Sequence, residues 1–198
     1  MNIIQEERIR RYFIDAAKDL IRGEGLSVVT ARNVAERAGY SYATLYNYFK
    51  DIRDLVFNCA EDFMTECCTF VMQESKGASE GSDGLEAVSK NYAKFFVQYP
   101  GIFFLLFQQK QSDISTASAE VAGIHTLFDT ITECEWKEIG RRATCGPDIL
   151  RCARENHKLA IHGLLMLYLN RRKDCDYKQL MDEIVAQTRF AVNAVQGA

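Results

Sequence analysis

The chain of 198 residues is poor in features that would interrupt a helix or carry it through a membrane. It has two prolines, Pro100 and Pro147, so helices can run long without a break. No apolar run approaches the ~18 residues that span a bilayer, and the charged start of the chain lacks the apolar stretch of a signal peptide. We therefore expect a chain that has no membrane contact and acts in the cytoplasm.

Signatures of metal sites and disulfides are also missing, although the chain contains seven cysteines. Their number is odd, none forms a C-x-x-C pair, and the three histidines do not supply paired zinc ligands. In a reducing cytosol most free cysteines serve as small buried apolar residues, and a redox-sensing thiol is the alternative. The sequence predicts no metal and no cofactor.

Two motifs of common enzyme classes do not occur either. The sequence contains no G-x-G-x-x-G and no H-E-x-x-H. Glu133 and Glu135 lie two residues apart, so on a helix they point in different directions and form no carboxylate pair. We expect a protein that is not an enzyme.

Positive and negative charges nearly balance over the whole chain, but they are unevenly distributed along it. The net charge is −3, which is too mild to indicate a polyanionic partner for the entire surface. Residues 1–55 carry nine Lys and Arg against eight Asp and Glu, whereas the remainder carries 15 against 19. A local basic excess of this size fits a nucleic-acid contact or an ordinary solvated face.

What the sequence does contain is helical periodicity along nearly its whole length. Apolar residues recur at three- and four-residue spacing over residues 9–21, which predicts a first helix ending near Gly23. Thr30 is a suitable N-cap for a second helix, Gly39 a suitable stop and Ser41 a suitable cap for a third. Two helices joined by a short turn with glycine predict a helix-turn-helix, and a generic helical hairpin would have the same spacing.

Tyrosines on the third helix favour a DNA-binding face. Leu45 and Phe49 lie four residues apart and form the inward side. Tyr42 and Tyr46 share a different face, next to the small residue Ala43. Tyrosine hydroxyls can donate to phosphate oxygens, and a small side chain lets the backbone approach base edges.

The stretch from Arg11 to Leu55 resembles the DNA-binding domain of the tetracycline-repressor (TetR) family of bacterial regulators. The matching pieces, in order and without gaps, are I-D-A-A-K-D-L-I at 14–21, G-L-S-V-V-T at 25–30, V-A-E-R-A-G-Y-S at 34–41 and T-L-Y-N-Y-F at 44–49. Members of this family are all-helical homodimers that bind palindromic operators through an N-terminal three-helix domain. Their larger C-terminal domain holds an effector pocket and the dimer interface.

Carried over position by position, the resemblance implies which residues contact double-stranded DNA. They are Thr30, Arg32, Tyr42, Ala43, Thr44, Tyr46, Asn47, Tyr48 and Lys50. Residue 30 contacts a phosphate at the cap of the second helix, residues 42–44 meet bases in the major groove, and residues 46–48 hold phosphates. One position departs from the family, which usually has lysine where this chain has Ile52, although Lys50 and Arg53 flank it.

Pattern and resemblance together predict an all-α fold of about nine helices. Residues 1–51 form the helix-turn-helix DNA-binding domain, and residues 52–198 the helical effector-binding and dimerisation domain. Asp51 caps a long fourth helix that passes Phe70. After a loop at 75–84, further helices are expected at about 85–99, 102–107, 124–136, 148–172 and 177–195, with a polar stretch at 108–118 between the second and third of these.

Aromatic residues of the larger domain are numerous enough to line an effector pocket, with two histidines as polar groups. The residues expected there are Phe63, Cys67, Phe70, Phe96, Phe103, Phe107, His125, Phe128, His162 and Met166. For any single aromatic residue, packing in the core is the simpler interpretation. The resemblance implies a cavity for the set, and its lining predicts a small effector that is mostly apolar or aromatic.

The last two helices each carry a broad apolar face, which predicts self-association. The residues assigned to the dimer interface are Ile161, Leu165, Tyr168, Leu180, Ile184, Thr188 and Ala191. Two helices from each of two subunits would form a four-helix interface around a two-fold axis. That symmetry would place two recognition helices in successive major grooves, ~34–36 Å apart.

The predicted function is a ligand-responsive transcriptional regulator. It binds a palindromic operator as a homodimer and is released by a small, mostly apolar effector, with repression as the commoner outcome in the family. The alternative is a helical ligand-binding dimer whose DNA binding is weakened or altered, because Ile52 replaces the usual lysine.

Overall fold

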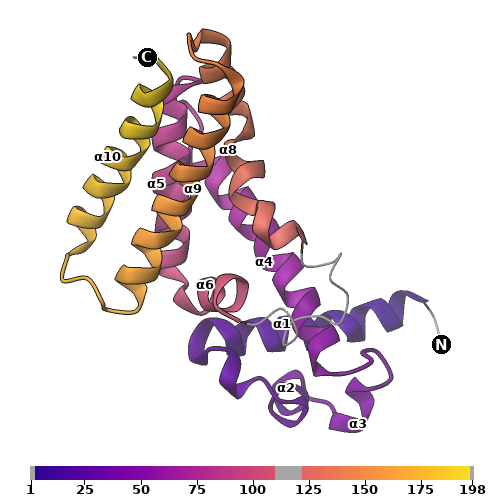
Figure 1. Cartoon of the computed structure of the whole chain (residues 1–198). Helices are drawn as coiled ribbons and strands as arrows, with labels where there is room; N and C mark the ends of the chain where they lie inside the picture. Colours follow the sequence, from indigo (N-terminus) through magenta and orange to yellow (C-terminus); the bar gives the residue numbers. More distant parts are fainter. Residues whose placement is uncertain (1–2, 110–121, 197–198) are drawn as a thin grey trace. The chain divides into compact units, whose positions relative to one another are not determined.

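The computed structural model describes residues 3–109 and 122–196, apart from the side chains of Ala122 and His125. The described residues form nine α-helices and one short 3-10 helix with no strand (Figure 1), which confirms the predicted all-α fold. The helices are α1 (Ile3–Glu24), η1 (Leu26–Val28), α2 (Ala31–Ala38), α3 (Tyr42–Leu45), α4 (Ile52–Glu74), α5 (Ser82–Gln98), α6 (Pro100–Phe107), α8 (Ala122–Arg142), α9 (Pro147–Leu169) and α10 (Tyr177–Gln196). None of those helices is both long and apolar enough to cross a membrane.

Contacts between residues divide the chain into two compact units. Unit 1 comprises Met1–Glu66 and Tyr99–His125, and unit 2 comprises Cys67–Gln98 and Thr126–Ala198. The division falls inside α4, whereas the domain boundary expected from the sequence follows residue 51. The sequence boundary at residue 51 stays a prediction. It marks the end of the helix-turn-helix, whereas the two units are defined by contacts between residues.

Unit 1 is organised around α1, whose inward side is apolar except for Lys18. Phe13, Ala17 and Ile21 are completely buried, and α2, α3 and α6 are built into the same unit. The backbone of α6 approaches α1 so closely that a Cβ at Gly101 would collide with the carbonyl oxygen of Ile21. Only glycine permits this approach, so α6 is held against the end of α1.

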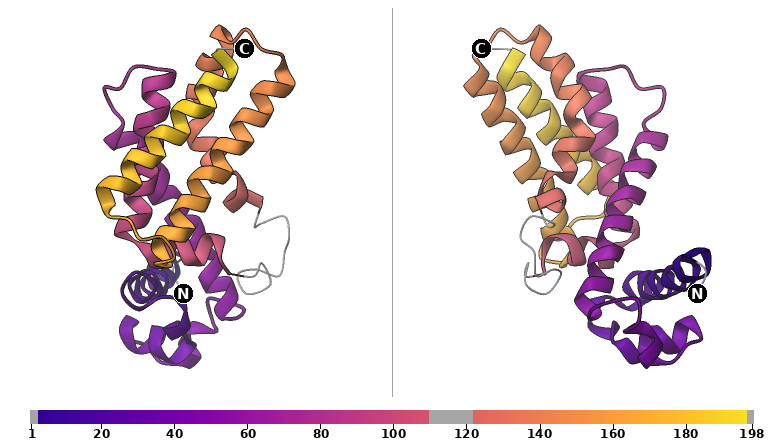
Figure 2. Two further views of the ribbon diagram at one scale, coloured as in Figure 1. Left: turned by 60° about the vertical axis from the view of Figure 1, so that its left-hand side comes forward. Right: turned by 90° about the vertical axis from the view of Figure 1, so that its right-hand side faces the viewer.

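Unit 2 contains α5 and the C-terminal helices. Figure 2 shows α9 and α10 side by side, joined by a turn. Both helices pack on α5. One cluster of buried residues comprises Leu85, Trp136, Ile139, Ala153, Ala191, Val192 and Val195. Apolar side chains on one face of each helix therefore meet in a shared core.

Two element boundaries differ from those expected from the sequence. The third helix ends at Leu45, and the chain continues as a turn in which Tyr48 N–H donates to the Leu45 carbonyl at 3.0 Å. Pro100 was expected to end a helix, and it is also the first residue of α6. At that position the missing N–H of proline costs nothing, because the first N–H groups of a helix have no partner within it. Most of the expected polar stretch, residues 110–118, lies outside the described residues.

Candidate nucleic-acid interface

Side-chain caps define both helices of the predicted helix-turn-helix. The N–H of Asn33 donates to Thr30 Oγ1 at 3.2 Å, and the N–H of Thr44 donates to Ser41 Oγ at 3.1 Å. Between the helices Gly39 adopts a left-handed conformation with φ of 78°, which glycine reaches without steric cost. The predicted caps and the glycine stop are confirmed.

The tyrosines around α3 divide into two pairs. Tyr40 and Tyr48 pack on the Phe13 ring of α1, with centroid distances of 5.4 and 6.1 Å. Tyr42 and Tyr46 point away from the core and are 63% and 51% exposed. The first pair stabilises unit 1, and the second is available to a partner.

The expected inward side of α3 is confirmed by burial. Leu45 is completely buried and Phe49 is 2% exposed, so both anchor the short helix. Ala43 and Asn47 are exposed and Thr44 is half-buried. Thr44 Oγ1 lies 2.8 Å from Ser41 Oγ, so part of its hydrogen-bonding capacity is used within the turn.

Two cations of residues 30–50 have no carboxylate partner in the described part of the chain. Arg32 on α2 and Lys50 are exposed, and neither forms an ion pair with any residue that the structure describes. In contrast, Arg37 pairs with Glu24 at 3.6 Å. An unpaired cation can neutralise a phosphate without first losing a protein partner.

The start of α4 carries the negative charge of Asp51 next to Ile52, the position where the family usually has lysine. The Asp51 carboxylate accepts from the N–H groups of Arg53 and Asp54 at 2.8 and 3.0 Å, as an N-cap does. These bonds, that from Asp54 first, lower the pKa of Asp51, and the Arg53 guanidinium pairs with the same carboxylate at 3.1 Å. Ile52 is half-buried, and Lys50 just before this helix start is exposed.

Comparison with known proteins agrees with this geometry. Residues 13–59 match the sequence profile of the bacterial regulatory proteins of the tetR family, a segment that runs from the buried core of α1 through the helix-turn-helix into α4. This segment of the chain is therefore similar to the DNA-binding segment of TetR-family regulators. The match covers the DNA-binding segment and leaves the residues after 59 to be compared by fold.

Solved structures with the same fold extend over the whole chain. A tetR-family transcriptional regulator from Streptomyces coelicolor is 18% identical with a TM-score of 0.73, covering 100% of this chain and 84% of that one. A TetR family transcription regulator from Marinobacter aquaeolei VT8 is 14% identical with a TM-score of 0.63, covering 98% of each chain. The transcriptional regulator FadR from Bacillus subtilis, solved with stearoyl-CoA, is 18% identical with a TM-score of 0.67, covering 95% and 98%.

The predicted effector residues fall into both units. In unit 1, Phe103 and Phe107 lie 5.1 Å apart between ring centroids. Phe63 is completely buried beneath two cations, with Lys18 Nζ at 5.5 Å and the Arg22 guanidinium at 5.1 Å from its ring centroid. Phe63 therefore belongs to the packing between α1 and α4. The side chain of His125 lies outside the described part of the chain.

In unit 2, four of the predicted residues lie in or beside one aromatic cluster. Phe96, Phe128 and His162 surround Tyr92, whose ring centroid is 4.8, 4.8 and 5.7 Å from theirs. Phe70 packs on Phe95, the neighbour of Phe96, at 5.6 Å. Of the two remaining residues, Cys67 is completely buried and Met166 is 45% exposed.

Buried polar groups inside unit 2 were not predicted. His157 is 1% exposed, and its Nε2 lies 3.0 Å from Thr188 Oγ1 and 3.3 Å from Ser89 Oγ. Both hydroxyls donate to backbone carbonyls, so His157 Nε2 carries the proton, and Nδ1 is left without a described hydrogen-bond partner. The sequence did contain a sign that His157 is buried, because it lies four residues before Ile161 and so on the same inward face of α9.

A buried ionic network in unit 1 was also missed. Lys18 is 4% exposed, and its ammonium lies 2.8 Å from Asp62 and 2.6 Å from Glu66 of α4. Arg11 pairs with Asp62 at 2.6 Å, and Arg22 pairs with Glu66. Although burial opposes it, hydrogen bonds from Lys18 and Arg11 lower the pKa of Asp62.

The predicted dimer residues require a correction. Six of the seven are buried within a single chain, all at 4% exposure or less: Ile161, Leu165, Leu180, Ile184, Thr188 and Ala191. A side chain enclosed by its own protomer has no surface to give to a partner. These residues instead form the contact of α9 and α10 inside unit 2, and Tyr168 is half-buried.

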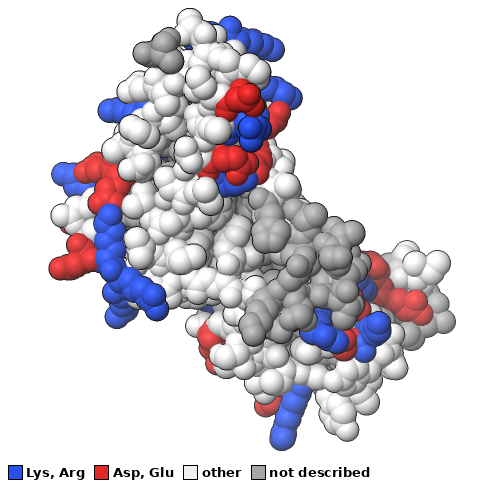
Figure 3. All heavy atoms as spheres, in the orientation of Figure 1, with Lys and Arg blue, Asp and Glu red and all other residues white. Residues whose placement is uncertain are grey.

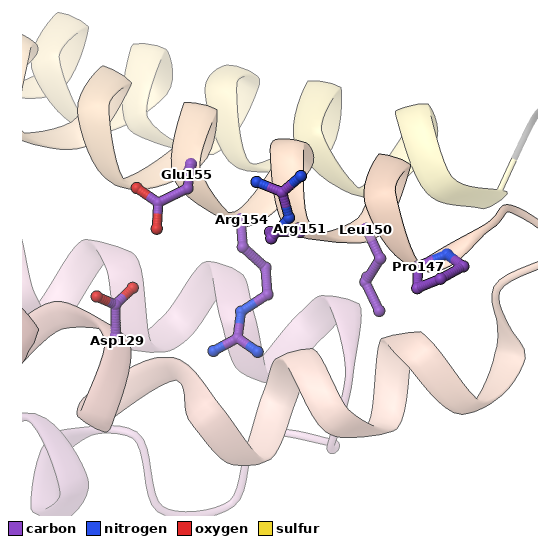
Figure 4. A pocket seen from close by; sticks show the side chains of 6 residues that line it. All are labelled: Asp129, Pro147, Leu150, Arg151, Arg154 and Glu155. Atoms are coloured by element: carbon purple, nitrogen blue, oxygen red, sulfur yellow. The ribbon is translucent and has the colours of Figure 1, made fainter.

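Three hollows of unit 2 are lined by described residues, and none includes a predicted effector residue. The hollow between α8 and α9 has a volume of about 360 Å³ and is shown in Figure 4. Positive and negative side chains lie together over these helices (Figure 3), where Arg154 pairs with Glu133 at 2.7 Å and Lys158 with Asp129 at 2.9 Å. This surface is neutralised by its own ion pairs.

The cysteines are all free, as expected. Cys59 and Cys67 are buried, and burial raises the pKa of Cys59 to about 12. A thiol held neutral in this way reacts slowly with oxidants, since the thiolate is the nucleophile. No group of three or more His, Cys, Asp or Glu within the described ranges is arranged to hold a metal ion.

Proposed function

We propose that this chain is a ligand-responsive transcriptional regulator of the TetR family that binds a palindromic operator as a homodimer. The observation that carries the proposal is the exposed face of α3, where Tyr42 and Tyr46 leave the core in a segment that also carries two unpaired cations. A monomeric core has no use for two half-exposed tyrosines. A DNA groove offers both phosphate oxygens and base edges to them.

Roles along α3 follow from side-chain chemistry and exposure. Tyr42 and Ala43 face outward at the start of the helix and meet base edges in the major groove. Thr44 shares its hydroxyl with Ser41, so it presents its methyl group, which suits the methyl group of thymine.

Phosphate contacts flank this reading face. Tyr46, Asn47 and Tyr48 hold the DNA backbone together with Thr30, Arg32 and Lys50. Of the tyrosines, Tyr48 contributes its hydroxyl while its ring stays on Phe13. This arrangement supports a duplex held by phosphates and read by the first turn of α3.

The effector is a small, mostly apolar or aromatic molecule whose binding releases the operator, so the protein acts as a repressor in the cytoplasm. Support comes from the aromatic clusters of both units, which offer much ring surface and few charges. The Bacillus subtilis FadR structure contains stearoyl-CoA, so long-chain acyl compounds stand first among the candidates to test.

The decisive experiment measures binding of the purified chain to labelled DNA from the flanks of its own gene, by gel shift and by fluorescence anisotropy. Binding should fall steeply with salt, with a log–log slope of roughly −0.9 for each phosphate neutralised. An effector found by thermal-shift screening should weaken operator binding, and operator should weaken effector binding by the same factor. Salt-insensitive or undetectable binding across a genomic fragment library would contradict the proposal.

A second candidate function is a helical ligand-binding dimer with weakened DNA binding. The specific observation in its favour is the Asp51 carboxylate that caps α4, with Ile52 in place of a cation. The Asp51 carboxylate next to position 52 repels phosphate, and Ile52 lacks the charge with which lysine would attract it. The same gel shift separates the two functions, because this candidate binds effector normally and shifts no fragment.

A further inference from the structure

A basic hollow lies at the surface of unit 2, where α5 meets the start of α10. Its volume is about 370 Å³, and it is lined by Lys90, Asn91, Lys94, Tyr177, Lys178 and Met181. Three of these six side chains are lysines and none of the six is acidic, although the whole chain has a net charge of −3. The hollow shares no residue with the predicted effector or DNA-binding residues, and all of its lining belongs to unit 2.

Two of the lysines have no carboxylate to neutralise them. Lys90 and Lys178 are exposed, and neither forms an ion pair with any residue that the structure describes. Glu86 lies four residues before Lys90 on α5, but its carboxylate is bound by the Arg189 guanidinium at 2.6 and 3.1 Å. Two positive charges therefore remain available at this hollow.

Two further polar side chains of the hollow are held by hydrogen bonds to the end of α4. Lys94 donates to Glu74 at 2.6 Å, and Asn91 Nδ2 donates to Ser75 Oγ at 3.0 Å. The hydrogen bond to Glu74 raises the pKa of Lys94, so this ammonium stays charged at neutral pH. An ammonium has three N–H donors, so one bond to Glu74 does not exhaust it.

An aromatic ring and a thioether form the apolar side of the hollow. Tyr177, the first residue of α10, is 45% exposed, and Met181 follows it by four residues, so both lie on one side of the helix. The face of a tyrosine ring stacks on other flat rings, and a methionine side chain adapts to aromatic surfaces. The hollow therefore combines positive charge with a surface for a ring.

Size and charge indicate the class of ligand. Pockets for small molecules have volumes of roughly 300–1,000 Å³, and this hollow of about 370 Å³ lies at the lower end of that range. A single carboxylate brings one negative charge, whereas a phosphate monoester carries about −1.5 to −2 near neutral pH. Lysine binds phosphate as a point charge, so two available ammonium groups match such an anion.

We propose that this hollow binds a small phosphate monoester that carries a flat ring, such as a nucleoside monophosphate. The phosphate lies between Lys90 and Lys178, and the ring lies on Tyr177 and Met181. This second site goes beyond the proposed function, because the effector proposed for the aromatic clusters is mostly apolar. It depends neither on DNA binding nor on a dimer.

The test titrates the full chain with phenyl phosphate by isothermal titration calorimetry, and repeats the titration with inorganic phosphate and with phenol. Phenyl phosphate should bind one equivalent per chain, at least about tenfold more tightly than either part, because charge and ring contribute at one site. Lys90→Gln and Lys178→Gln should each weaken binding about fivefold, since each removes one charged contact. Tyr177→Ala should weaken phenyl phosphate by a similar factor through loss of the ring contact.

Lys137→Gln is the matched control, because Lys137 is an exposed lysine of unit 2 that lies outside the hollow. It should leave the dissociation constant within about twofold. All four substituted side chains are exposed, so circular dichroism melting of the unliganded variants should match the wild type.

Three results would overturn the inference. They are no binding of phenyl phosphate at millimolar concentration, equal affinity of the wild type and the Lys90→Gln/Lys178→Gln double variant, and inorganic phosphate binding as tightly as phenyl phosphate. The last result would leave a general attraction for anions without a site for a ring. Tight, lysine-dependent binding of phenyl phosphate to a chain that shifts no DNA would support the inference while the proposed regulator function fails.

Discussion

The Tyr92 hydroxyl donates a hydrogen bond to Nε2 of His162, with 3.0 Å between the atoms. The direction follows from the other side of the ring, where His162 Nδ1 lies 2.8 Å from the Lys158 carbonyl oxygen. A carbonyl only accepts, so Nδ1 carries the proton and Nε2 offers its lone pair. This tautomer is that of a neutral imidazole, and it holds α5 and α9 together in unit 2.

Acidification should destabilise the protein through its buried histidines. Burial lowers the pKa of His157 to about 4, and burial also lowers the pKa of His162. The unfolded chain binds these protons near pH 6.5, so stability is full above that value and is lost as pH falls towards 4. His157 alone should contribute a loss of about 3 kcal/mol over this range.

Urea unfolding measured from pH 7 to pH 4 checks this expectation. His157→Gln should be less stable at pH 7 and should flatten the profile between pH 6.5 and 4, because its side chain does not titrate. A profile of His157→Gln with the wild-type slope would assign the acid sensitivity to other groups.

Two substitutions on α3 should separate affinity from sequence preference. Tyr46→Phe removes only a hydroxyl, so it should weaken every operator variant by a similar factor, about 1 kcal/mol for the lost hydrogen bond. Tyr42→Ala should instead change which sequences are preferred. Anisotropy titrations against a panel of single-base operator variants distinguish these outcomes. If neither variant changes affinity or sequence preference, α3 does not bind in the major groove.

Unpaired cations should carry more of the salt dependence than paired ones. Arg32→Ala and Lys50→Ala should each lower the log–log salt slope by about 1, since each removes one phosphate contact. Arg37→Ala is the control, because its guanidinium already pairs with Glu24 at 3.6 Å. Salt slopes of Arg32→Ala and Lys50→Ala that equal the wild-type slope would show that these side chains do not neutralise phosphates.

Lys18→Met should destabilise unit 1 by about 2 kcal/mol. Removing one partner of a buried ion pair leaves uncompensated charge, although the carboxylates of Asp62 and Glu66 are partly exposed and recover some hydration. Arg11→Ala, whose side chain is 48% exposed, should cost less than about 1 kcal/mol. Urea denaturation of both variants provides the comparison, and an unchanged midpoint for Lys18→Met would mean that the network adds nothing to stability.

Features governed by local chemistry were predictable from the sequence. The Thr30 and Ser41 caps and the Gly39 stop depend on neighbours within four residues, so their residue types sufficed. Leu45 and Phe49 were predictable because their spacing places them on one side. The roles of the DNA-facing residues came from family resemblance, and they stay predictions.

Features that depend on which elements meet were harder. Helix α9 has an inward apolar face with Ile161 and Leu165 and an outward one with Leu159 and Met166, and periodicity alone does not say which faces a second chain. The ion pairs of Lys18 join residues more than 40 positions apart. A lysine between Ile14 and Ile21 on the buried side of α1 was still a signal for a distant carboxylate.

The brevity of α3 has a consequence for how this protein can change over time. The helix has four residues, and its hold on unit 1 comes from Leu45 and the following Phe49, while positions 42, 43, 46 and 47 touch solvent. Substitutions at exposed positions usually alter stability by ~0.5 kcal/mol or less. Mutations can therefore explore new reading surfaces there with little penalty to folding, so DNA specificity and stability are free to diverge along separate evolutionary paths.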